Sequence, residues 1–349
     1  MTENNKNSKI TYAASGVDVK AGEDAVNRIK SLAASTFNAQ VLTGLGSFGG
    51  FFKPELADYK EPVLLSSTDS VGTKLKVAFM TDKHTTIGQC LVNHCINDIL
   101  VHGAKSMFFL DYIGVGKLKQ DTIADIVEGV TIACKENETA LVGGEMAELP
   151  DFYAPGEYDL VGFVVGMVDK DKIVNGSTIK EGDVCLGLPS TGLHTNGYTL
   201  ARKVAFDIGG LKPDTYVEEL GTTIGDALLA VHKCYAPLIH NLLDSHTING
   251  MAHITGGGIP GNLKRILPEN LSAEINKSSW DAVPIFDYLK ILGDIDLVDI
   301  YSAFNMGIGY ILVVDEKDAD AISASIRQFG EKVYRIGFIT KGDGTVKLV

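Results

Sequence analysis

The chain has few cysteines and no long apolar run. Its five cysteines are odd in number, and none is spaced as a Cys-x-x-Cys pair. We therefore expect no disulfide framework and a reducing compartment. No run reaches the ~18 apolar residues that a bilayer span requires, and residues 1–9 are polar, without the apolar core of a signal peptide. The sequence predicts a cytoplasmic protein with a frayed start and no membrane partner.

Positive charge is also scarce, with 31 Lys and Arg against 44 Asp and Glu and a net charge of −13. A field of this sign repels polyanions, which argues against nucleic acid or an anionic membrane as a partner. Phosphorylated ligands would have to be bound by local lysines, metal ions and helix N-termini. The length of 349 residues and the 45% hydrophobic content are enough for about two domains with real cores.

An apolar, partly β-branched run at 62–65 predicts a strand, and the stretch Ser-Ser-Thr-Asp-Ser-Val-Gly-Thr-Lys follows it at 66–74. A strand that ends in a Gly-containing turn presents backbone N–H groups. The carboxylate of Asp69 is suited to Mg²⁺, and the ammonium of Lys74 is suited to phosphate. The same residue types are ordinary in turns, so a plain turn is the competing interpretation of this stretch alone.

The Gly-rich segment 44–53 contains a G-x-G-x-x-G pattern, with Asp69 about twenty residues further on, as a dinucleotide-binding fingerprint requires. The context does not fit, because a predicted helix at 24–34 precedes the pattern and residues 51–54 do not open a helix. Two interpretations stay open for this segment. It is either a flexible loop that folds over a phosphate or adenine, or a plain surface loop.

The segment 86–101 has apolar residues at helical spacing, and Asp98 is its only acid. A carboxylate in such a helix must be exposed or paired, because burying it alone would cost several kcal/mol. A metal ion is one possible partner, and Asp69 could supply a second ligand.

Possible zinc ligands recur at every fourth position of this segment: Cys90, His94, Asp98 and His102. On an α-helix each fourth residue is rotated by ~40° from the one before it, so the four side chains point in different directions and cannot bind one ion. We interpret the stripe as a core cysteine and histidines with ordinary hydrogen-bond partners.

Two further predicted strands end in a carboxylate. The strand at 105–113 carries Asp111 near its end, and the short strand at 139–142 leads into Gly143-Gly144-Glu145. Ligands at strand ends on one edge of a sheet are a common way to form a single site from distant residues. Solvated turn acids are the alternative, and the sequence does not separate the two for Asp111.

A polar segment with two glycine-bearing turns at 169–180 marks the predicted domain boundary. We therefore predict an N-terminal domain at 1–170, with α+β character, and a C-terminal α/β domain at 171–349. The first is expected to contain a helix that Asp121 caps and a strand at 158–168. The elements predicted in the second are strands at 184–188, 251–254, 271–275, 309–314 and 333–339, and helices from 198 and at 263–267, 283–292 and 319–329.

Two turns of the second half are rich in hydroxyl groups and glycine. The first, at 189–197, contains His194 and Asn196 and precedes a predicted helix; the second, at 255–262, follows His253 and has three adjacent glycines. Such turns at helix starts bind anions through their backbone N–H groups. They are equally suited to tight chain reversal, because glycine adopts unusual backbone angles at little cost.

Seven motifs together closely resemble the phosphoribosylformylglycinamidine cyclo-ligase family, also called aminoimidazole ribonucleotide synthetases. They occur in the family's order from about Tyr12 to the C-terminus: Thr68-Asp69-Ser70-Val71-Gly72-Thr73-Lys74, Asn97-Asp98, Phe108-Phe109-Leu110-Asp111-Tyr112, Gly143-Gly144-Glu145, His194-Thr195-Asn196-Gly197-Tyr198, Thr255-Gly256-Gly257-Gly258 and Phe304-Asn305-Met306-Gly307-Ile308-Gly309. This ordered set is far more specific than any single motif.

The resemblance implies a two-domain α/β fold in which two N-terminal domains pair as a homodimer, with their strands closing a shared barrel. It implies ATP and Mg²⁺ as cofactors. The expected reaction converts formylglycinamidine ribonucleotide and ATP into aminoimidazole ribonucleotide, ADP and phosphate, by way of a phosphorylated amide oxygen, in purine biosynthesis.

The resemblance also implies roles for single residues. Asp69, Asp98 and Glu145 are expected to bind Mg²⁺, while Lys74 meets the nucleotide phosphates. His194 and Asn196 are expected to contact the substrate or the transferring phosphoryl group, and His253 is a candidate proton acceptor. The residues expected to bind ATP are Gly46, Gly49, Gly50, Phe51, Thr68, Asp69, Gly72, Thr73 and Lys74, the first four as part of a loop that covers the nucleotide.

The sequence departs from the family pattern at Ser70, where Gly is common, and at Thr195, where Ser is common. Three relatives in the superfamily fit less well. Selenophosphate synthetases need a reactive residue near the N-terminus, but no cysteine precedes Cys90; thiamine-phosphate kinases usually have a Gly-Asp-Asp near the start, which this sequence lacks; and formylglycinamide ribonucleotide amidotransferases carry a glutaminase that 349 residues cannot hold. Two functions from other classes stay open: an NAD-dependent dehydrogenase, on the Gly-rich segment alone, and a non-catalytic ATP-binding module.

Overall fold

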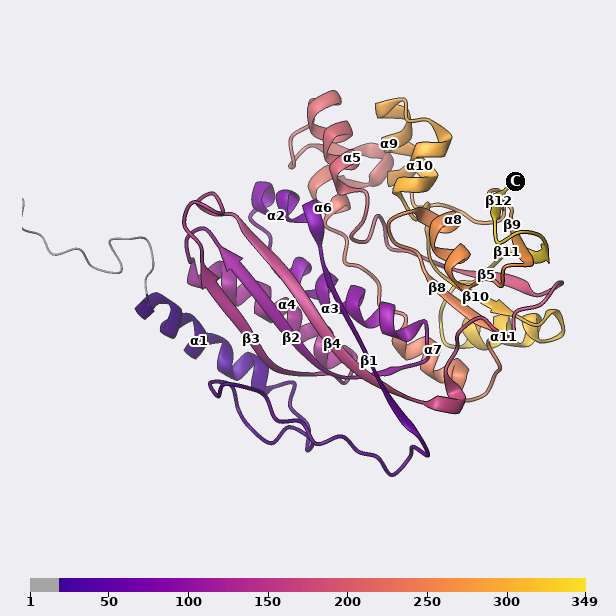
Figure 1. Ribbon diagram of the computed structural model, residues 1–349. Helices are drawn as coiled ribbons and strands as arrows, with labels where there is room; N and C mark the ends of the chain where they lie inside the picture. Colours follow the sequence, from indigo (N-terminus) through magenta and orange to yellow (C-terminus); the bar gives the residue numbers. More distant parts are fainter. Residues whose placement is uncertain (1–18) are drawn as a thin grey trace, which may run out of the picture.

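The computed structural model describes residues 19–349, so the polar start at 1–9 lies outside the described part. The first half forms a four-stranded sheet with the order β1-β4-β2-β3 (Figure 1). Its strands are β1 (Pro62–Ser70), β2 (Lys105–Val115), β3 (Ala140–Glu148) and β4 (Tyr158–Asp169). β4 is antiparallel to both of its neighbours, whereas β2 and β3 are parallel. A mixed α/β fold was predicted, and this arrangement confirms it.

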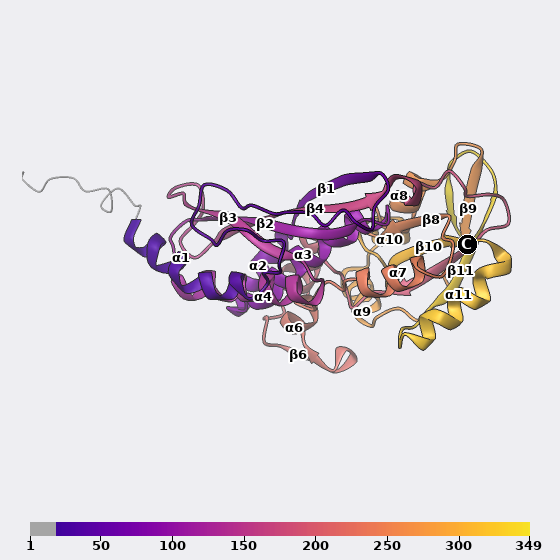
Figure 2. The same ribbon diagram turned by 90° about the horizontal axis from the view of Figure 1, so that it is seen from below.

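The helices of this half cover one face of the sheet, as Figure 2 shows from below. They are α1 (Val19–Ala34), α2 (Leu75–Thr81), α3 (Thr85–Leu100) and α4 (Gln120–Glu136), and the short 3-10 helix η2 (Gly72–Lys74) joins β1 to α2. The opposite face has no helix over it and carries exposed apolar side chains, including Leu64 on β1 and Phe163 on β4. In a single chain the helices therefore bury one face, and the other is covered only in part, where Phe52 packs against Phe108 of β2.

Helices α3 and α4 cross closely at a pair of glycines. A Cβ atom at Gly129 would lie 1.9 Å from the carbonyl oxygen of Thr85, and one at Gly88 would lie 2.1 Å from that of Ile126. These distances leave no room for any side chain at the crossing. The crossing fixes the position of α3, which carries two residues of the site described below.

Replacing Gly129 by Ala is therefore expected to destabilise the protein by about 2 to 3 kcal/mol, because the added methyl group forces two packed backbones apart. Gly22 in α1 is the matched control, since a Cβ there would meet nothing within 4 Å. Gly22→Ala is expected to raise stability slightly, by up to ~1 kcal/mol, through helix propensity. Urea unfolding of both variants measures the difference, and equal effects would contradict the close crossing.

The second half forms a six-stranded sheet with the order β12-β9-β11-β5-β10-β8. Its strands are β5 (Val184–Pro189), β8 (Gly250–His253), β9 (Leu271–Ile275), β10 (Ile308–Val314), β11 (Tyr334–Lys341) and β12 (Val346–Leu348). β10 is buried along its whole length. A separate two-stranded ribbon pairs β6 (Tyr216–Val217) with β7 (Thr222–Thr223).

The helices of the second half pack around this sheet. They are α5 (Tyr198–Arg202), α6 (Ile224–Leu228), α7 (Ala236–Leu243), α8 (Gly258–Leu263), α9 (Ile285–Gly293), α10 (Leu297–Ala303) and α11 (Glu316–Gln328), with a π-helical turn η4 (Lys203–Ile208) after α5 and short 3-10 turns η3 (Lys170–Lys172), η5 (Glu218–Leu220) and η6 (Lys264–Ile266). None of the helices in residues 19–349 has the length and apolar character needed to cross a bilayer.

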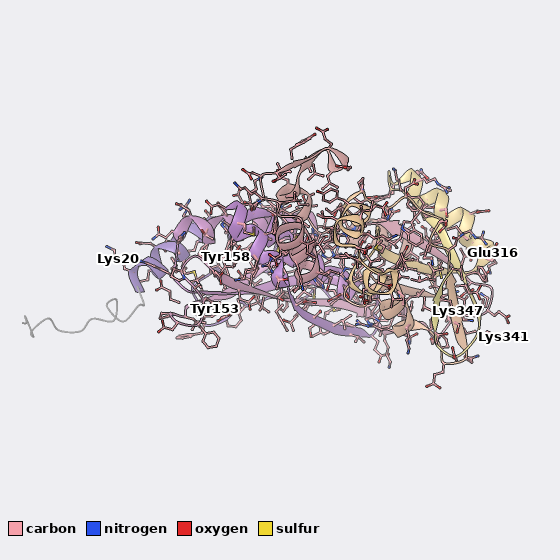
Figure 3. The ribbon with its side chains drawn as sticks, turned by 90° about the horizontal axis from the view of Figure 1, so that it is seen from above. Lys20, Tyr153, Tyr158, Glu316, Lys341 and Lys347 are labelled. Carbon is pink, nitrogen blue, oxygen red and sulfur yellow. The ribbon has the colours of Figure 1, made fainter. Side chains whose placement is uncertain are left out.

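The two halves lie end to end, so that Lys20 and the pair Lys341 and Lys347 are at opposite ends of the molecule (Figure 3). All strands of the four-stranded sheet come before residue 170, and all strands of the six-stranded sheet come after residue 183. The division into domains at 1–170 and 171–349 stays a prediction. The site described next lies where the two halves meet.

Four local predictions were wrong in detail. β1 continues through Ser70, so Asp69 lies within a strand, and β3 continues through Glu148, so Glu145 does too. Asp121 lies inside the first turn of α4 and does not cap it, because the helix starts one residue earlier. The helix predicted at 263–267 begins at Gly258, inside the Gly-rich turn.

Candidate cation and phosphate site

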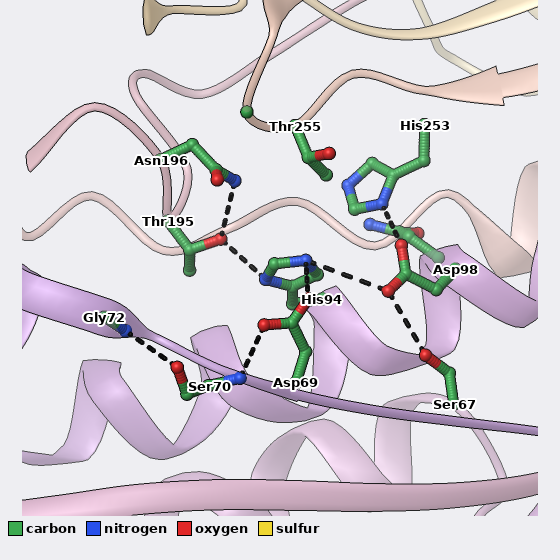
Figure 4. A network of polar contacts seen from close by, with 12 residues as sticks. Ser67, Asp69, Ser70, Gly72, His94, Asp98, Thr195, Asn196, His253 and Thr255 are labelled. Atoms are coloured by element: carbon green, nitrogen blue, oxygen red, sulfur yellow. Dashed lines mark hydrogen bonds and ion pairs between the residues drawn. The ribbon is translucent and has the colours of Figure 1, made fainter. Parts of the chain in front are cut away.

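Asp69 and Asp98 lie close together at the junction of the two halves (Figure 4). β1 carries Asp69 on the face that α3 covers, and α3 carries Asp98 toward the same strand, where Ser67 donates a hydrogen bond of 3.3 Å to Asp98 Oδ2. His94, one turn before Asp98, has its Nε2 atom 2.9 Å from Asp69 Oδ2 and 3.9 Å from Asp98 Oδ2. Both carboxylates thus lie near the imidazole of His94 in a single chain, and their assignment as a pair of metal ligands stays a prediction.

His253 reaches the same cluster from the end of β8. Its Nδ1 atom donates to Asp98 Oδ1 over 2.9 Å. Burial alone would raise the pKa of Asp98, but the hydrogen bonds from His253 and Ser67 and the neighbouring imidazoles outweigh burial, and the pKa is lowered overall. Burial lowers the pKa of His253 more than the Asp98 charge raises it, so the imidazole is neutral at pH 7. A neutral imidazole of this kind can accept a proton.

The turn after β5 adds a hydroxyl and an amide to the cluster. Thr195 Oγ1 lies 2.7 Å from His94 Nδ1 and 3.2 Å from Nδ1 of His232, and the Asn196 side chain donates to Thr195 over 3.5 Å. His232 in turn places its Nε2 atom 3.0 Å from Nε2 of His253. The predicted residues Asn196 and His253 thus belong to one polar network with Asp98.

His194 lies beside this network in an uncommon backbone conformation, with φ of +61°. Its ring stacks on that of His232, with centroids 4.0 Å apart. Burial lowers the pKa of His194 well below its usual value, and its Nδ1 atom has no hydrogen-bond partner among residues 19–349. A buried ring nitrogen without a partner is rare in folded proteins.

Lys74 is placed differently from the prediction. Its side chain is fully buried, and Nζ donates to the carbonyl oxygens of His194 (2.8 Å) and Ala230 (2.6 Å) and lies 3.1 Å from Cys90 Sγ. Burial lowers the pKa of this ammonium. Because its donors are used inside the protein, Lys74 does not face the open side of the site, and the phosphate contact expected of it is wrong for this structure. The side chain instead ties the segment after β1 to two loops of the second half.

Glu145 does not join the two aspartates. It is exposed on β3, and β4 and β2 lie between β3 and β1 in the sheet. Three steps of ~4.8 Å between strands separate it from Asp69 by roughly 14 Å, too far to share one ion. Asp111 of β2 is nearer to Asp69 than Glu145 is, because Asp69 and Asp111 both lie opposite Gly162 of β4. Burial raises the pKa of Asp111 to about 7. It faces the covering helices.

The Gly-rich loop is also remote from Asp69 within one chain. Gly50 packs against β3, where a Cβ would lie 2.7 Å from the carbonyl oxygen of Val142. Phe51 is more than half exposed, and Gly46 has a φ of +111° that favours glycine. The structure therefore does not bring Gly46, Gly49, Gly50 and Phe51 next to the carboxylates. No strand is found between α1 and this loop, which agrees with the rejection of a dinucleotide-binding fingerprint.

The remaining predicted residues lie at the end of β1. Thr68 donates to the carbonyl oxygen of Gly162 over 2.9 Å, and Thr73 shares a hydrogen bond of 3.0 Å with Thr199 of α5. Gly72 has a φ of +55° and donates its N–H to Ser70 Oγ over 3.3 Å. These residues shape the turn beside Asp69, and Thr73 joins it to the second half.

Sequence reasoning missed two members of the cluster. His94 was assigned to the stripe of satisfied histidines, although its spacing of four residues from Asp98 placed both on one face of α3. His232 carried no signal, because its neighbours in sequence form no recognisable motif. Both are buried.

Comparison with known families agrees with this geometry. Residues 56–168 match the N-terminal domain of AIR synthase related proteins, and residues 180–349 match the C-terminal domain. A protein of Alkaliphilus oremlandii named phosphoribosylformylglycinamidine cyclo-ligase is 49% identical over 96% of this chain and 98% of its own length. The chain belongs to the family of AIR synthase related proteins. A family member of the same name from Desulfatibacillum aliphaticivorans is 50% identical over 95% of both chains.

Solved structures of two proteins with other names have the same fold. A thiamine-monophosphate kinase from Stenotrophomonas maltophilia superposes with a TM-score of 0.69 and 16% identity over 93% of this chain and 95% of its own. A hydrogenase maturation protein HypE in complex with ATP superposes with a TM-score of 0.65 and 18% identity over 92% of this chain and 90% of its own. The two superpositions show the fold of this chain, and at such low identity they say nothing of its activity.

Proposed function

We propose that the protein is an ATP-dependent cyclo-ligase that converts formylglycinamidine ribonucleotide into aminoimidazole ribonucleotide, with release of ADP and phosphate, in purine biosynthesis. Near full-length relatives at about half identity carry the name of this activity. The single observation in the molecule that supports it best is the pair Asp69 and Asp98, held with His253 where the two halves meet. A HypE protein of this fold binds ATP, which supports ATP as the cofactor.

The residues present fit a divalent cation. Asp69 Oδ2 and Asp98 Oδ2 lie 2.9 and 3.9 Å from the same atom, Nε2 of His94, and the two side chains are 40% and 28% exposed. Magnesium is usually held by one or two carboxylates, with water and substrate phosphates completing its shell. A cation bound there would neutralise charge on the transferring phosphoryl group. Asp69 and Asp98 are its proposed ligands, and the geometry within one chain leaves Glu145 out.

The chemistry of the reaction matches the rest of the network. The formyl oxygen is a poor leaving group until the γ-phosphoryl group of ATP is transferred to it, and the amidine nitrogen then displaces it as phosphate. The ring nitrogen loses a proton in this step, and neutral His253, backed by Asp98, can accept it. His194 and Asn196 are proposed to hold the substrate, since ring closure within one molecule gains chiefly from alignment.

The test is direct. The purified protein is mixed with ATP, Mg²⁺ and formylglycinamidine ribonucleotide, and the aromatic amine and ADP are both measured. Formation of the two in equal amounts supports the proposal. ATP binding without any product would favour a non-catalytic module, and saturable binding of NADH would favour a dehydrogenase; either result would contradict the proposal.

We further propose that a second copy of this chain covers the open face of the four-stranded sheet, as the resemblance to the family implies. Leu64 is 65% exposed and Phe163 is 40% exposed on that face. Apolar residues on a wide, uncovered sheet are typical of an interface with a partner.

The assignment of Gly46, Gly49, Gly50 and Phe51 to ATP stays a proposal, as does a cytoplasmic location.

Replacing Phe163 by Lys is expected to convert a dimer into a monomer, because a charge would be buried at the centre of the paired sheets. Light scattering after size exclusion measures the mass. Phe338→Lys is the matched control, since Phe338 is an exposed phenylalanine on β11 of the other sheet. A dimer that survives Phe163→Lys, or a wild-type protein that is monomeric at micromolar concentration, would contradict the interface.

A further inference from the structure

His232 lies on the segment between α6 and α7, and its side chain is completely buried. The proposed reaction gives this residue no role, because a ring without exposed surface cannot touch a bound ribonucleotide. Its ring nevertheless contacts His194, which is assigned to the substrate, and its Nε2 atom lies 3.0 Å from Nε2 of His253, the proposed proton acceptor. The position of His232 therefore requires a separate explanation.

Helix α3 holds the backbone of His232 on both sides. Asn93 donates from Nδ2 to its carbonyl oxygen over 2.8 Å, and the N–H group of His232 donates to Cys90 Sγ over 3.3 Å. Asn93 and Cys90 are themselves buried. The backbone of His232 is therefore fixed to a long helix, although the residue belongs to a segment without regular structure.

Two polar contacts fix the edge of the His232 ring. The Asn97 side chain accepts the N–H of Tyr235 at Oδ1 over 3.0 Å, so its NH₂ group is turned to the other side and donates to Nε2 of His232 over 3.3 Å. Burial lowers the pKa of His232 well below its usual value, so the ring is neutral. Its proton is therefore on Nδ1, which donates to Thr195 Oγ1 over 3.2 Å.

The ring of His194 has few polar contacts of its own. Its Nδ1 atom has no hydrogen-bond partner among residues 19–349, and its Nε2 atom accepts only a long contact of 3.4 Å from the N–H of Thr191. Hydrogen bonds of this kind do little to decide how a ring is turned. The carbonyl oxygen of His194 accepts from Lys74 over 2.8 Å. The backbone of His194 is thus held by a hydrogen bond, whereas the orientation of its ring depends on packing.

This packing comes from His232 and from β10. The rings of His194 and His232 have centroids 4.0 Å apart and planes inclined by 17°, which is a stacked arrangement. Burial lowers the pKa of both imidazoles well below their usual values, so the two neutral rings stack without repulsion between charges. A Cβ atom at Gly309 of β10 would lie 2.5 Å from Cε1 of His194. The face of His232 and the backbone of Gly309 therefore hold the His194 ring in place.

We propose that His232 is a positioning residue of the reaction, and that it orients the ring of His194 toward the ribonucleotide by stacking against it. This inference rests on the proposed function, in which His194 holds the substrate. His232 touches no substrate and acts only through His194. Because ring closure depends on alignment, a small rotation of the His194 ring is expected to lower the rate as well as the affinity.

The test compares two variants that both lose the polar contacts of His232 but differ in the stack. Phenylalanine keeps a flat ring against His194, whereas leucine offers none. In His232→Leu we expect kcat/KM for formylglycinamidine ribonucleotide to fall by about 10²-fold, with an unchanged KM for ATP. His232→Phe is expected to recover most of this loss. His246→Leu is the matched control with wild-type constants, because His246 bonds to Ser325 of α11 over 2.8 Å and contacts neither ring.

A second measurement does not depend on activity. Histidine labelled with ¹³C at Cε1 gives an NMR signal for each of the eight histidines, and His194→Asn identifies that of His194. In the wild type the proton on Cε1 of His194 is expected to be shifted upfield by the ring current of His232. The shift is expected to disappear in His232→Leu and to remain in His232→Phe.

Three results would overturn the inference: equal losses of kcat/KM in the leucine and phenylalanine variants, wild-type kinetics in His232→Leu, or a His194 signal without an upfield shift in the wild type. The last of these needs no variant of His232 to fold. A failure of the proposed function would appear differently, as a wild-type protein that forms no product in the turnover assay.

Discussion

Asp98→Asn is expected to abolish turnover that depends on a divalent cation, a loss of at least roughly 10³-fold, while the fold stays intact. The substitution removes the negative charge that faces His94 and His253. It also replaces one of the two carboxylate oxygens by an NH₂ group, so a bound cation would lose its charged ligand. The amide has nearly the same size as the carboxylate, and Ser67 can still donate to its oxygen.

Turnover with ATP and the ribonucleotide measures this effect, and circular dichroism with thermal unfolding checks the fold. Asp121→Asn is the matched control, because Asp121 is an exposed carboxylate on α4 whose ion pair with Arg28 lies at the surface. It is expected to keep wild-type rates. If Asp98→Asn turned over normally, Asp98 would have no place in the cation site.

Lys74→Met is expected to lower the free energy of unfolding by about 3 kcal/mol. Methionine matches the length and apolar stem of lysine, but it donates no hydrogen bond. The carbonyl oxygens of His194 and Ala230, which accept from Nζ over 2.8 and 2.6 Å, would be left without this donor. Because one of them belongs to His194, the turn that carries this residue is expected to loosen as well.

The matched control is Lys76→Met, two residues further along. Lys76 is 40% exposed and pairs with Glu157 at the surface, so its loss is expected to cost less than ~1 kcal/mol. Urea unfolding of the two variants provides the comparison. A Lys74→Met protein of wild-type stability with a raised KM for ATP would restore Lys74 as a phosphate contact and contradict its structural role.

The strands and helices were largely predictable, because their apolar residues recur at the expected periods. The strand predicted at 271–275 has the same bounds in the structure, and the helix predicted at 86–101 differs by one residue at each end. β1 was predicted too short, because Ser66 to Ser70 are polar. Its pairing with β4 continues through Ser70 all the same, since hydrogen bonds in a sheet join backbones and do not require apolar side chains.

Part of the site was predictable for a similar reason. Asp98 is the single acid of its helix, and Asp69 follows an apolar strand, so each needed a partner of opposite charge or a cation. The role of Lys74 was not predictable, because its acceptors are backbone carbonyl oxygens 120 and 156 residues away in the chain. Glu145 was placed in the site because it follows a strand in sequence, but the order of strands in the sheet puts it at the far edge from β1.

The most direct test of the cation site is a crystal of the protein grown with Mn²⁺ and a non-hydrolysable ATP analogue. Anomalous scattering from manganese locates the ion without reference to the protein model. We predict a peak beside the carboxylates of Asp69 and Asp98 of the same chain, bound to at least one of them, with a phosphate oxygen of the nucleotide next to it. A nucleotide and its ion bound elsewhere, with no peak at these two carboxylates, would contradict the account.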